Sequence, residues 1–320
     1  MSQSHEVEET HDPQEASESI SPKLVVDCFI FYNELELLKY RLTILDDVVD
    51  FFILVEAAHT FTGNKKELEF GNNRHLFKQF LHKIIHVVVY DAPFKHPNIC
   101  VAKGEQWENE YFQRNCIHRG LDQLKNQLGP KDIIIIGDVD EIPDPRIIAD
   151  IKSPAPSSTY PQPLDNVAVE MDLYYYNLLN RLDVVWRCCK VVAYEHYIKN
   201  QMSCQSIRAA PIRSAIKNGG WHLSYFGDAV FISNKLNSFS HQEFNLPVYS
   251  NADAINNNIC KGADIFSRNI AIRRVNLCDN PFLPPRYDTL MAQYCGGGGS
   301  GGGSSSGTAI PVIASDPAPP

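Results

Sequence analysis

Hydrophobic and polar residues alternate along the chain in a rhythm that predicts an α/β protein. Apolar, β-branched runs predict strands, and amphipathic stretches between them predict helices. The expected strands are 24–31, 48–57, 84–93 and the run from Ile133, and the expected helices are 34–45, 75–84 and 106–128. Such alternation favours a mostly parallel central sheet flanked by helices and joined by right-handed crossovers.

The later part of the chain predicts shorter elements. Residues 166–178, 186–197 and 219–226 are expected as partly antiparallel strands, and 232–239 as a helix. Proline and serine make 153–163 an exposed loop. We therefore expect a smaller, mixed C-terminal part beside the parallel sheet.

Both ends of the chain differ in composition from the middle. Residues 1–22 are acidic and nearly free of apolar side chains, which predicts a disordered tail. The folded domain is expected over 23–295. A Gly/Ser linker at 296–307, typical of an engineered tether, then leads to an appended Pro-rich peptide at 308–320.

Composition excludes some classes of partner. A formal net charge of -9 argues against a nucleic-acid surface, which needs clustered Lys and Arg. No stretch reaches the roughly 18 to 20 apolar residues of a membrane span, so the chain as given is expected to be soluble, with no membrane segment. Nine scattered cysteines and the absence of Asn-x-Ser/Thr sites favour a reducing compartment.

The stretch "IIIIGDVDEIPDP", from Ile133 to Pro145, carries the clearest chemical signal. A strand buried on both faces ends directly in acids, and the carboxyl ends of strands are where open α/β sheets bind ligands. Asp138 and Asp140 flank Val139, so in extended geometry their carboxylates share one face. Because such a pair repels, it suits magnesium or manganese, which commonly bridge carboxylates to a substrate diphosphate.

Together with this motif, several segments resemble one known family. In chain order they are "FYNELELLKYRL" from Phe31, "VVDFFILVEAAHTFTG" from Val48, "WENEYFQRN" from Trp107, "GDVDEIP" from Gly137, "GGWHLSYF" from Gly219 and "KLNSFSHQEFN" from Lys235. The chain resembles glycosyltransferase family 17, the β-1,4-mannosyl-glycoprotein 4-β-N-acetylglucosaminyltransferase family, over roughly 23–294. The resemblance implies a GT-A-like fold, a UDP-GlcNAc donor, a Mn²⁺ or Mg²⁺ ion and inversion at the anomeric carbon.

The resemblance also gives expected roles to individual residues. The metal is expected on Asp138 and Asp140, with His222 as a further ligand and His241 as the alternative. An inverting transferase needs a carboxylate to take the proton of the acceptor hydroxyl. The candidates for this base are Glu243 first, then Asp228 and Glu141.

Donor contacts are expected mainly from the first half of the chain. Asn33, Glu34 and Glu56 follow predicted strands, at positions suited to uracil or ribose. Arg114 is expected on the diphosphate, with Asp138 reaching it through the metal. Trp221, beside His222, is the candidate for stacking on a sugar. Residues 60–66 are expected to form a loop over the donor, with Gly63 at its turn.

Three functional hypotheses remain open from the sequence. The first acceptor is the β-mannose of a glycoprotein glycan. The second is a protein Ser or Thr, as in a soluble protein O-GlcNAc transferase acting on the tail at Thr308 or Ser315. The third is a non-catalytic protein that binds a sugar nucleotide or glycan. The compartment follows from the same choice: cytoplasmic if the chain is complete, Golgi lumen if an anchor was removed.

Overall fold

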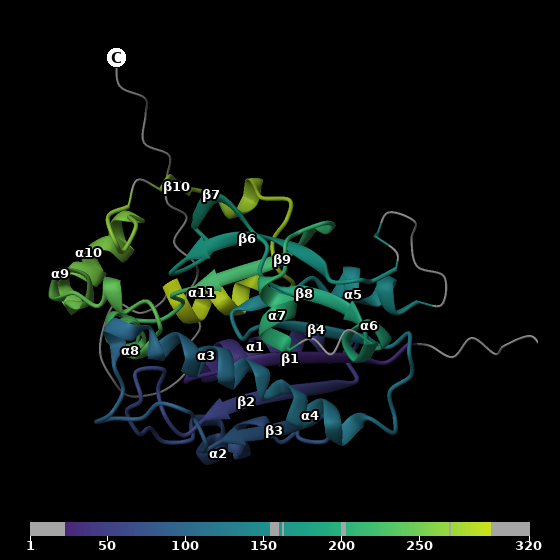
Figure 1. Ribbon diagram of the computed structural model, residues 1–320. Helices are drawn as coiled ribbons and strands as arrows, with labels where there is room; N and C mark the ends of the chain where they lie inside the picture. The colour runs from purple at the N-terminus through teal and green to yellow at the C-terminus, as the bar shows by residue number, and fades with distance from the viewer. Residues whose placement is uncertain (1–22, 154–159, 162, 200–202, 269, 296–320) are drawn as a thin grey trace, which may run out of the picture.

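The computed structural model describes residues 23–153, 160–161, 163–199, 203–268 and 270–295 (Figure 1). The expected tail at 1–22, linker at 296–307 and peptide at 308–320 lie outside the described residues. So does much of the loop expected at 153–163.

The first half of the chain builds the parallel sheet that its pattern predicts. Strands β1 (Val25–Phe31), β2 (Phe51–Ala57), β3 (Ile84–Val89) and β4 (Ile133–Asp138) run parallel in the order β3-β2-β1-β4. Since β2 and β4 flank β1 on opposite sides, the winding of the chain reverses between β1 and β4. Open α/β sheets bind ligands at the carboxyl ends of strands at such a reversal.

The second half extends the same sheet, so the expectation of a mostly parallel sheet is wrong for the whole molecule. Its strands are β5 (Glu141–Pro143), β6 (Val167–Tyr175), β7 (Asn180–Trp186), β8 (Lys190–Ala193), β9 (Ala215–Ser224) and β10 (Ile272–Arg274). Among the described strands four pairings are parallel and five antiparallel. The fold is therefore α/β with one large mixed sheet flanked by helices.

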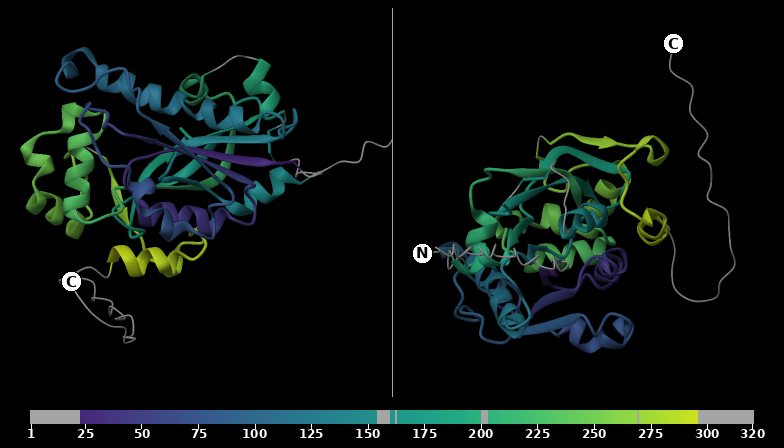
Figure 2. Two further views of the ribbon diagram at one scale, coloured as in Figure 1. Left: turned by 90° about the horizontal axis from the view of Figure 1, so that it is seen from below. Right: turned by 90° about the vertical axis from the view of Figure 1, so that its right-hand side faces the viewer.

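Helices cover both faces of the parallel half (Figure 2). On one face α1 (Leu35–Leu45) and α11 (Tyr287–Cys295) lie over alternate strand residues such as Phe29 and Ile135. On the other face α4 (Ile117–Leu124) covers residues of opposite parity such as Cys28 and Ile134. This alternation is the two-residue period of a strand buried on both faces.

The remaining helices lie around this core. They are α2 (Glu69–Asn73), η1 (Arg74–Phe77), η2 (Val101–Lys103), α3 (Glu105–Asn115), α5 (Pro145–Lys152), α6 (Tyr194–Lys199), α7 (Cys204–Ala209), α8 (Ala229–Ser238), η3 (Gln242–Phe244), α9 (Pro247–Ser250), α10 (Ala252–Lys261) and η4 (Leu277–Asp279). Helices α8 to α10 lie together at the end of the sheet where β1 and β2 finish (Figure 1).

Three predicted elements differ from the structure. The helix expected at 75–84 is wrong, because only Phe77 and Phe80 of this stretch are buried and the chain proceeds by short turns such as the Phe80 N–H to Phe77 carbonyl bond. The helix expected at 106–128 divides at Cys116 into α3 and α4. The strand expected at 186–197 gives way to α6 from Tyr194.

Two further observations, on the cysteines and on membrane-spanning helices, apply to the described residues. Eight cysteines there are free thiols. Among the same residues, no helix combines the length and the apolar character that crossing a bilayer requires.

Candidate functional site

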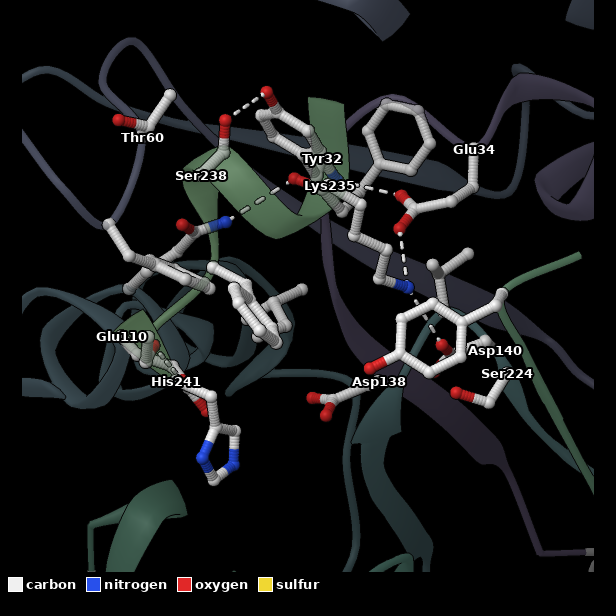
Figure 3. Close-up of a pocket in the computed structure, with 18 of the residues that line it drawn as sticks. Tyr32, Glu34, Thr60, Glu110, Asp138, Asp140, Ser224, Lys235, Ser238 and His241 are labelled. Atoms are coloured by element: carbon white, nitrogen blue, oxygen red, sulfur yellow. Dashed lines mark hydrogen bonds and ion pairs between the residues drawn. The ribbon is translucent and has the colours of Figure 1, made fainter. Parts of the chain in front are cut away.

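A cavity of about 250 Å³ opens at the point where the strand order reverses (Figure 3). Its wall includes Ile30 from β1, Asp138 at the end of β4 and Asp140 just after it. Helix α8 adds Lys235 and the segment after it adds His241. The site therefore lies where the fold class places ligands.

Asp138 is held between two guanidinium groups. Its Oδ1 lies 3.1 Å from Arg114 Nη2, and its Oδ2 lies 2.7 Å from Arg208 Nη2. Burial favours the neutral carboxyl, but Arg208 and Arg114 outweigh it and hold the pKa of Asp138 below the ordinary 3.8. Asp138 is therefore a carboxylate at neutral pH.

Asp140 faces a different cation. Its Oδ2 lies 3.1 Å from Lys235 Nζ, and its Oδ1 lies 3.6 Å from His222 Nε2. Burial acts to raise the pKa of Asp140, but Lys235 and His222 hold it far below its ordinary value. The same Lys235 ammonium lies 3.3 Å from Glu34 Oε1, so it joins β4 to the start of α1 (Figure 3).

Glu141 lies behind the cavity wall. Its side chain is fully buried and accepts bonds from Arg208, from Trp186 Nε1 at 2.5 Å and from the Asp138 N–H at 2.9 Å. This candidate base therefore orients Arg208, Trp186 and the strand end around it.

Arg41 braces the acidic segment from within the core. Its guanidinium pairs with Asp27 at 2.7 Å and donates to the backbone carbonyls of Asp138, Val139 and Glu141. Both partners of the pair are fully buried. The buried Arg41 guanidinium, which does not line the cavity, thus fixes the backbone that carries Asp138 and Asp140.

The candidate donor residues divide into two groups. Glu34 lines the cavity, as do Thr60, Phe61 and Lys66 of the expected loop, and Gly63 turns that loop with φ of 82°. Asn33 lines a neighbouring polar hollow.

Two other donor candidates are engaged away from the cavity. Glu56 is fully buried and accepts from the Phe70 and Gly71 N–H groups and from His86 Nε2 at 2.9 Å, so it caps α2. Arg114, expected on a diphosphate, is buried and reaches Asp138 instead.

Trp221 does not face the cavity, so its expected stacking on a sugar is wrong. Its side chain is fully buried, stacks on Phe282 at a ring distance of 4.7 Å and donates to the Phe282 carbonyl. Two other tryptophans, Trp107 and Trp186, line the cavity. His222 also lines it, because neighbouring residues of β9 point to opposite faces.

The two later acids proposed as the base lie outside the cavity wall. Asp228 is exposed and accepts from the Phe231 N–H as the N-cap of α8. Glu243 is exposed and lies 2.7 Å from His241 Nδ1. Burial acts to raise the pKa of Glu243, but the bond from His241 lowers it below 4.5.

The side chains at this site only partly fit a divalent ion. Within the described residues, no three His, Cys, Asp or Glu side chains gather closely enough to hold one. Asp138 and Asp140 do face the cavity, and His222 Nδ1 is buried without a hydrogen-bond partner. Two carboxylates fit magnesium or manganese when substrate phosphates supply further ligands.

Sequence reasoning missed the cations of the site. Arg208 comes from α7, a short helix with no motif around it. Lys235 lies in the segment "KLNSFSHQEFN", where the resemblance itself was a signal. The charge of Asp138 and Asp140 also called for partners of opposite sign, but their positions could not be read from spacing.

Fold and site together define an α/β protein whose cavity combines carboxylates, fixed cations and aromatic rings. A family model described as "Glycosyltransferase family 17" matches residues 3–269, and the chain belongs to that family.

Curated relatives share a shorter region with this chain. Proteins named β-1,4-mannosyl-glycoprotein 4-β-N-acetylglucosaminyltransferase from Rattus norvegicus, Homo sapiens and Mus musculus are each 30% identical over 125 residues. The matched region is 38% of this chain and 22% of each relative. The chain therefore matches about a fifth of the length of these relatives.

Proposed function

We propose that this protein transfers GlcNAc from UDP-GlcNAc to the β-linked mannose of a glycoprotein glycan. The observation that carries the proposal is the pairing of Asp138 and Asp140 with Arg208 and Lys235 in one cavity at the strand reversal. Family membership and the names of the three relatives support the same sugar and acceptor.

The cations of the cavity suit a diphosphate leaving group. Lys66, Arg208 and Lys235 all line it. Negative charge grows on UDP as its bond to the sugar breaks, and fixed donors stabilise charge that develops in the transition state. The burial that would lower the pKa of Lys235 is outweighed by Asp140 and Glu34, which raise it, so the ammonium stays charged.

A divalent cation is part of the proposal. Asp138 and Asp140 would hold Mn²⁺ or Mg²⁺, with His222 beside Asp140 and the donor's phosphates as further ligands. Such an ion neutralises charge on the diphosphate. We also propose that the GT-A arrangement applies and that the anomeric configuration inverts, as a single displacement by the acceptor oxygen would require.

The test measures transfer and its target together. The full chain is incubated with UDP-GlcNAc, Mn²⁺ and an N-glycan that carries the β-mannose, and UDP release and the intact masses of glycan and protein are recorded. We expect a gain of one HexNAc on the glycan, lost in Asp138→Asn and Asp140→Asn and kept in the matched exposed control Asp253→Asn.

Each competing hypothesis gives its own result in this assay. If the protein itself gains one HexNAc, and a chain ending at Cys295 does not, the acceptor is the tail and not the glycan. If the protein binds UDP-GlcNAc but releases no UDP, it is a non-catalytic sugar-nucleotide-binding protein.

A further inference from the structure

The acceptor hydroxyl of the proposed reaction must lose a proton, and the acids first considered for this role do not face the cavity. Glu141 is fully buried, Asp228 caps α8, and Glu243 is turned to His241. A base must come within hydrogen-bond reach of the proton that it takes.

The carboxylates that do line the cavity are each held by a cation. Asp138 pairs with Arg114 and Arg208, Asp140 and Glu34 pair with Lys235, and Glu110 pairs with Arg114. Despite their burial, these cations hold the pKa of Asp138 and of Asp140 below the ordinary value, so both are weakened bases. Glu34 and Glu110 are already engaged by Lys235 and Arg114.

His241 lies in the cavity wall in a different arrangement. Its Nδ1 lies 2.7 Å from Glu243 Oε1, and its ring packs edge-on against Trp107 with centroids 4.5 Å apart. In Figure 3 its ring lies across the cavity from Asp140, with Asp138 between them. When Nδ1 donates its proton to a carboxylate, the lone pair of a neutral imidazole resides on Nε2.

The other two imidazoles of the cavity lack this arrangement. His222 is turned to Asp140 at 3.6 Å, and its Nδ1 is buried without a partner. His59 Nδ1 is likewise buried without a hydrogen-bond partner. Among the imidazoles that line the cavity in the described part of the chain, His241 has the ring nitrogen that a carboxylate fixes at hydrogen-bond distance.

We infer that His241 is the general base of the transfer and that Glu243 is its positioning residue; this rests on the proposed function. The acceptor O–H bond breaks and its proton passes to His241 Nε2. The acceptor oxygen bonds to the anomeric carbon as the bond from that carbon to the β-phosphate oxygen breaks, and the electron pair leaves with UDP. Glu243 then faces an imidazolium, whose charge it stabilises.

Other charged groups share the cavity with His241 and contribute to any pH profile. They are Glu110 on α3, Asp138 at the end of β4, Asp140 just after it, Glu34 before α1, Lys66 on the loop after β2, Arg208 on α7, Lys235 on α8, and the imidazoles of His59 and His222. Glu243 lies on η3, two residues after His241 in the chain.

The experiment compares His241→Ala, His241→Gln and Glu243→Gln with two controls outside the cavity wall, His118→Gln and Glu195→Gln. Transfer to the N-glycan and the Kd of UDP are measured from pH 5 to 9, with and without added imidazole. We expect the His241 variants to lose about 10²- to 10⁴-fold in kcat, the contribution typical of a general base. The Kd of UDP should stay within about twofold, because the base touches the acceptor.

Two further readouts separate catalysis from a structural role. Imidazole should restore part of the activity of His241→Ala, where the removed ring leaves space. The fall in kcat/KM at low pH should disappear in His241→Ala. Glu243→Gln should lower kcat while the Kd of UDP stays unchanged, because the carboxylate no longer orients the imidazole ring.

The inference and the proposed function fail in different ways. If the wild type transfers GlcNAc and folded His241→Ala keeps its kcat within about threefold, or gains nothing from imidazole, the inference alone is overturned. If the wild type binds UDP-GlcNAc but transfers it to no glycan, the proposed function is overturned and the inference falls with it.

Discussion

Lys235 and Asp140 lie 95 positions apart in the chain, yet their charged atoms meet at 3.1 Å in the wall of the cavity. The Lys235 side chain is 19% exposed and that of Asp140 is 10% exposed. A pair so sheltered from water interacts more strongly than one on the surface. It links the acidic segment after β4 to helix α8.

Replacing Lys235 by Met should damage both stability and activity. Removal of one partner leaves Asp140 and Glu34 as sheltered charges without a cation, which costs about 3 kcal/mol of the free energy of unfolding. A loss of about 10²-fold in kcat/KM is expected as well, because a fixed donor to the leaving group is gone. Urea unfolding and UDP release measure the two effects.

The matched control for this change is Lys199→Met. Lys199 is 72% exposed and pairs with Glu195 on α6. Unchanged stability and turnover are expected there, since exposed pairs contribute little. If Lys235→Met turns over at the wild-type rate, Lys235 has no role in the reaction.

Trp221 and Trp186 should separate stability from substrate binding. Trp221→Phe removes part of a fully buried ring and its bond to the Phe282 carbonyl, so we expect a loss of about 2 kcal/mol in the free energy of unfolding. The KM for donor and acceptor should not change. Trp186 lies in the cavity wall and donates to Glu141. Trp186→Phe removes the bond that orients this ring, so a higher KM is expected.

Urea unfolding and initial rates at varied donor and acceptor concentrations check both tryptophan variants. If Trp221→Phe has a raised KM and unchanged stability, Trp221 contacts the substrate and the prediction is wrong.

Local sequence pattern was sufficient for the strands of the parallel half of the fold, although not for all of its helices. The isoleucines from Ile133 to Ile136 are buried on alternating faces, and the acids lie at the carboxyl end of the strand, as predicted. The choice of Trp221 failed for a simple reason. The prediction depends on its place beside His222, but adjacent residues in a strand face opposite ways.

The rest depended on contacts between distant segments. Arg208 reaches Asp138 across 70 positions, and β9 pairs with both β5 and β6. Local propensity does not specify such partners, because strand pairing is determined by tertiary packing. The sequence likewise does not show the contact between Glu243 and His241, which depends on the local fold after α8.

Stability should fall in acid as the pair at Asp140 is lost. The folded pKa of Asp140 is held below its unfolded value of 3.8. Its contribution is therefore fully present above that value and disappears as pH falls below it toward the folded pKa. Urea unfolding from pH 7 to 3 should show Asp140→Asn less stable than wild type at neutral pH, with a difference that shrinks below about pH 4.

Asp253→Asn is the control, because Asp253 is exposed on α10. A stability difference between wild type and Asp140→Asn that stayed constant down to pH 3 would show that the pair does not titrate as described.

Binding of a divalent ion should depend on the donor. The described residues offer two carboxylates at the cavity but no group of three ligating side chains, and both carboxylates already contact cations. Mn²⁺ alone should therefore bind weakly, and UDP should strengthen its binding at least about tenfold by supplying phosphate ligands. Linkage requires Mn²⁺ to strengthen UDP binding by the same factor. Calorimetric titrations in both orders measure this coupling; free GlcNAc, which lacks phosphates, should produce none, and Asp140→Asn should abolish it. Equal Mn²⁺ affinity with and without UDP would contradict a site completed by the substrate.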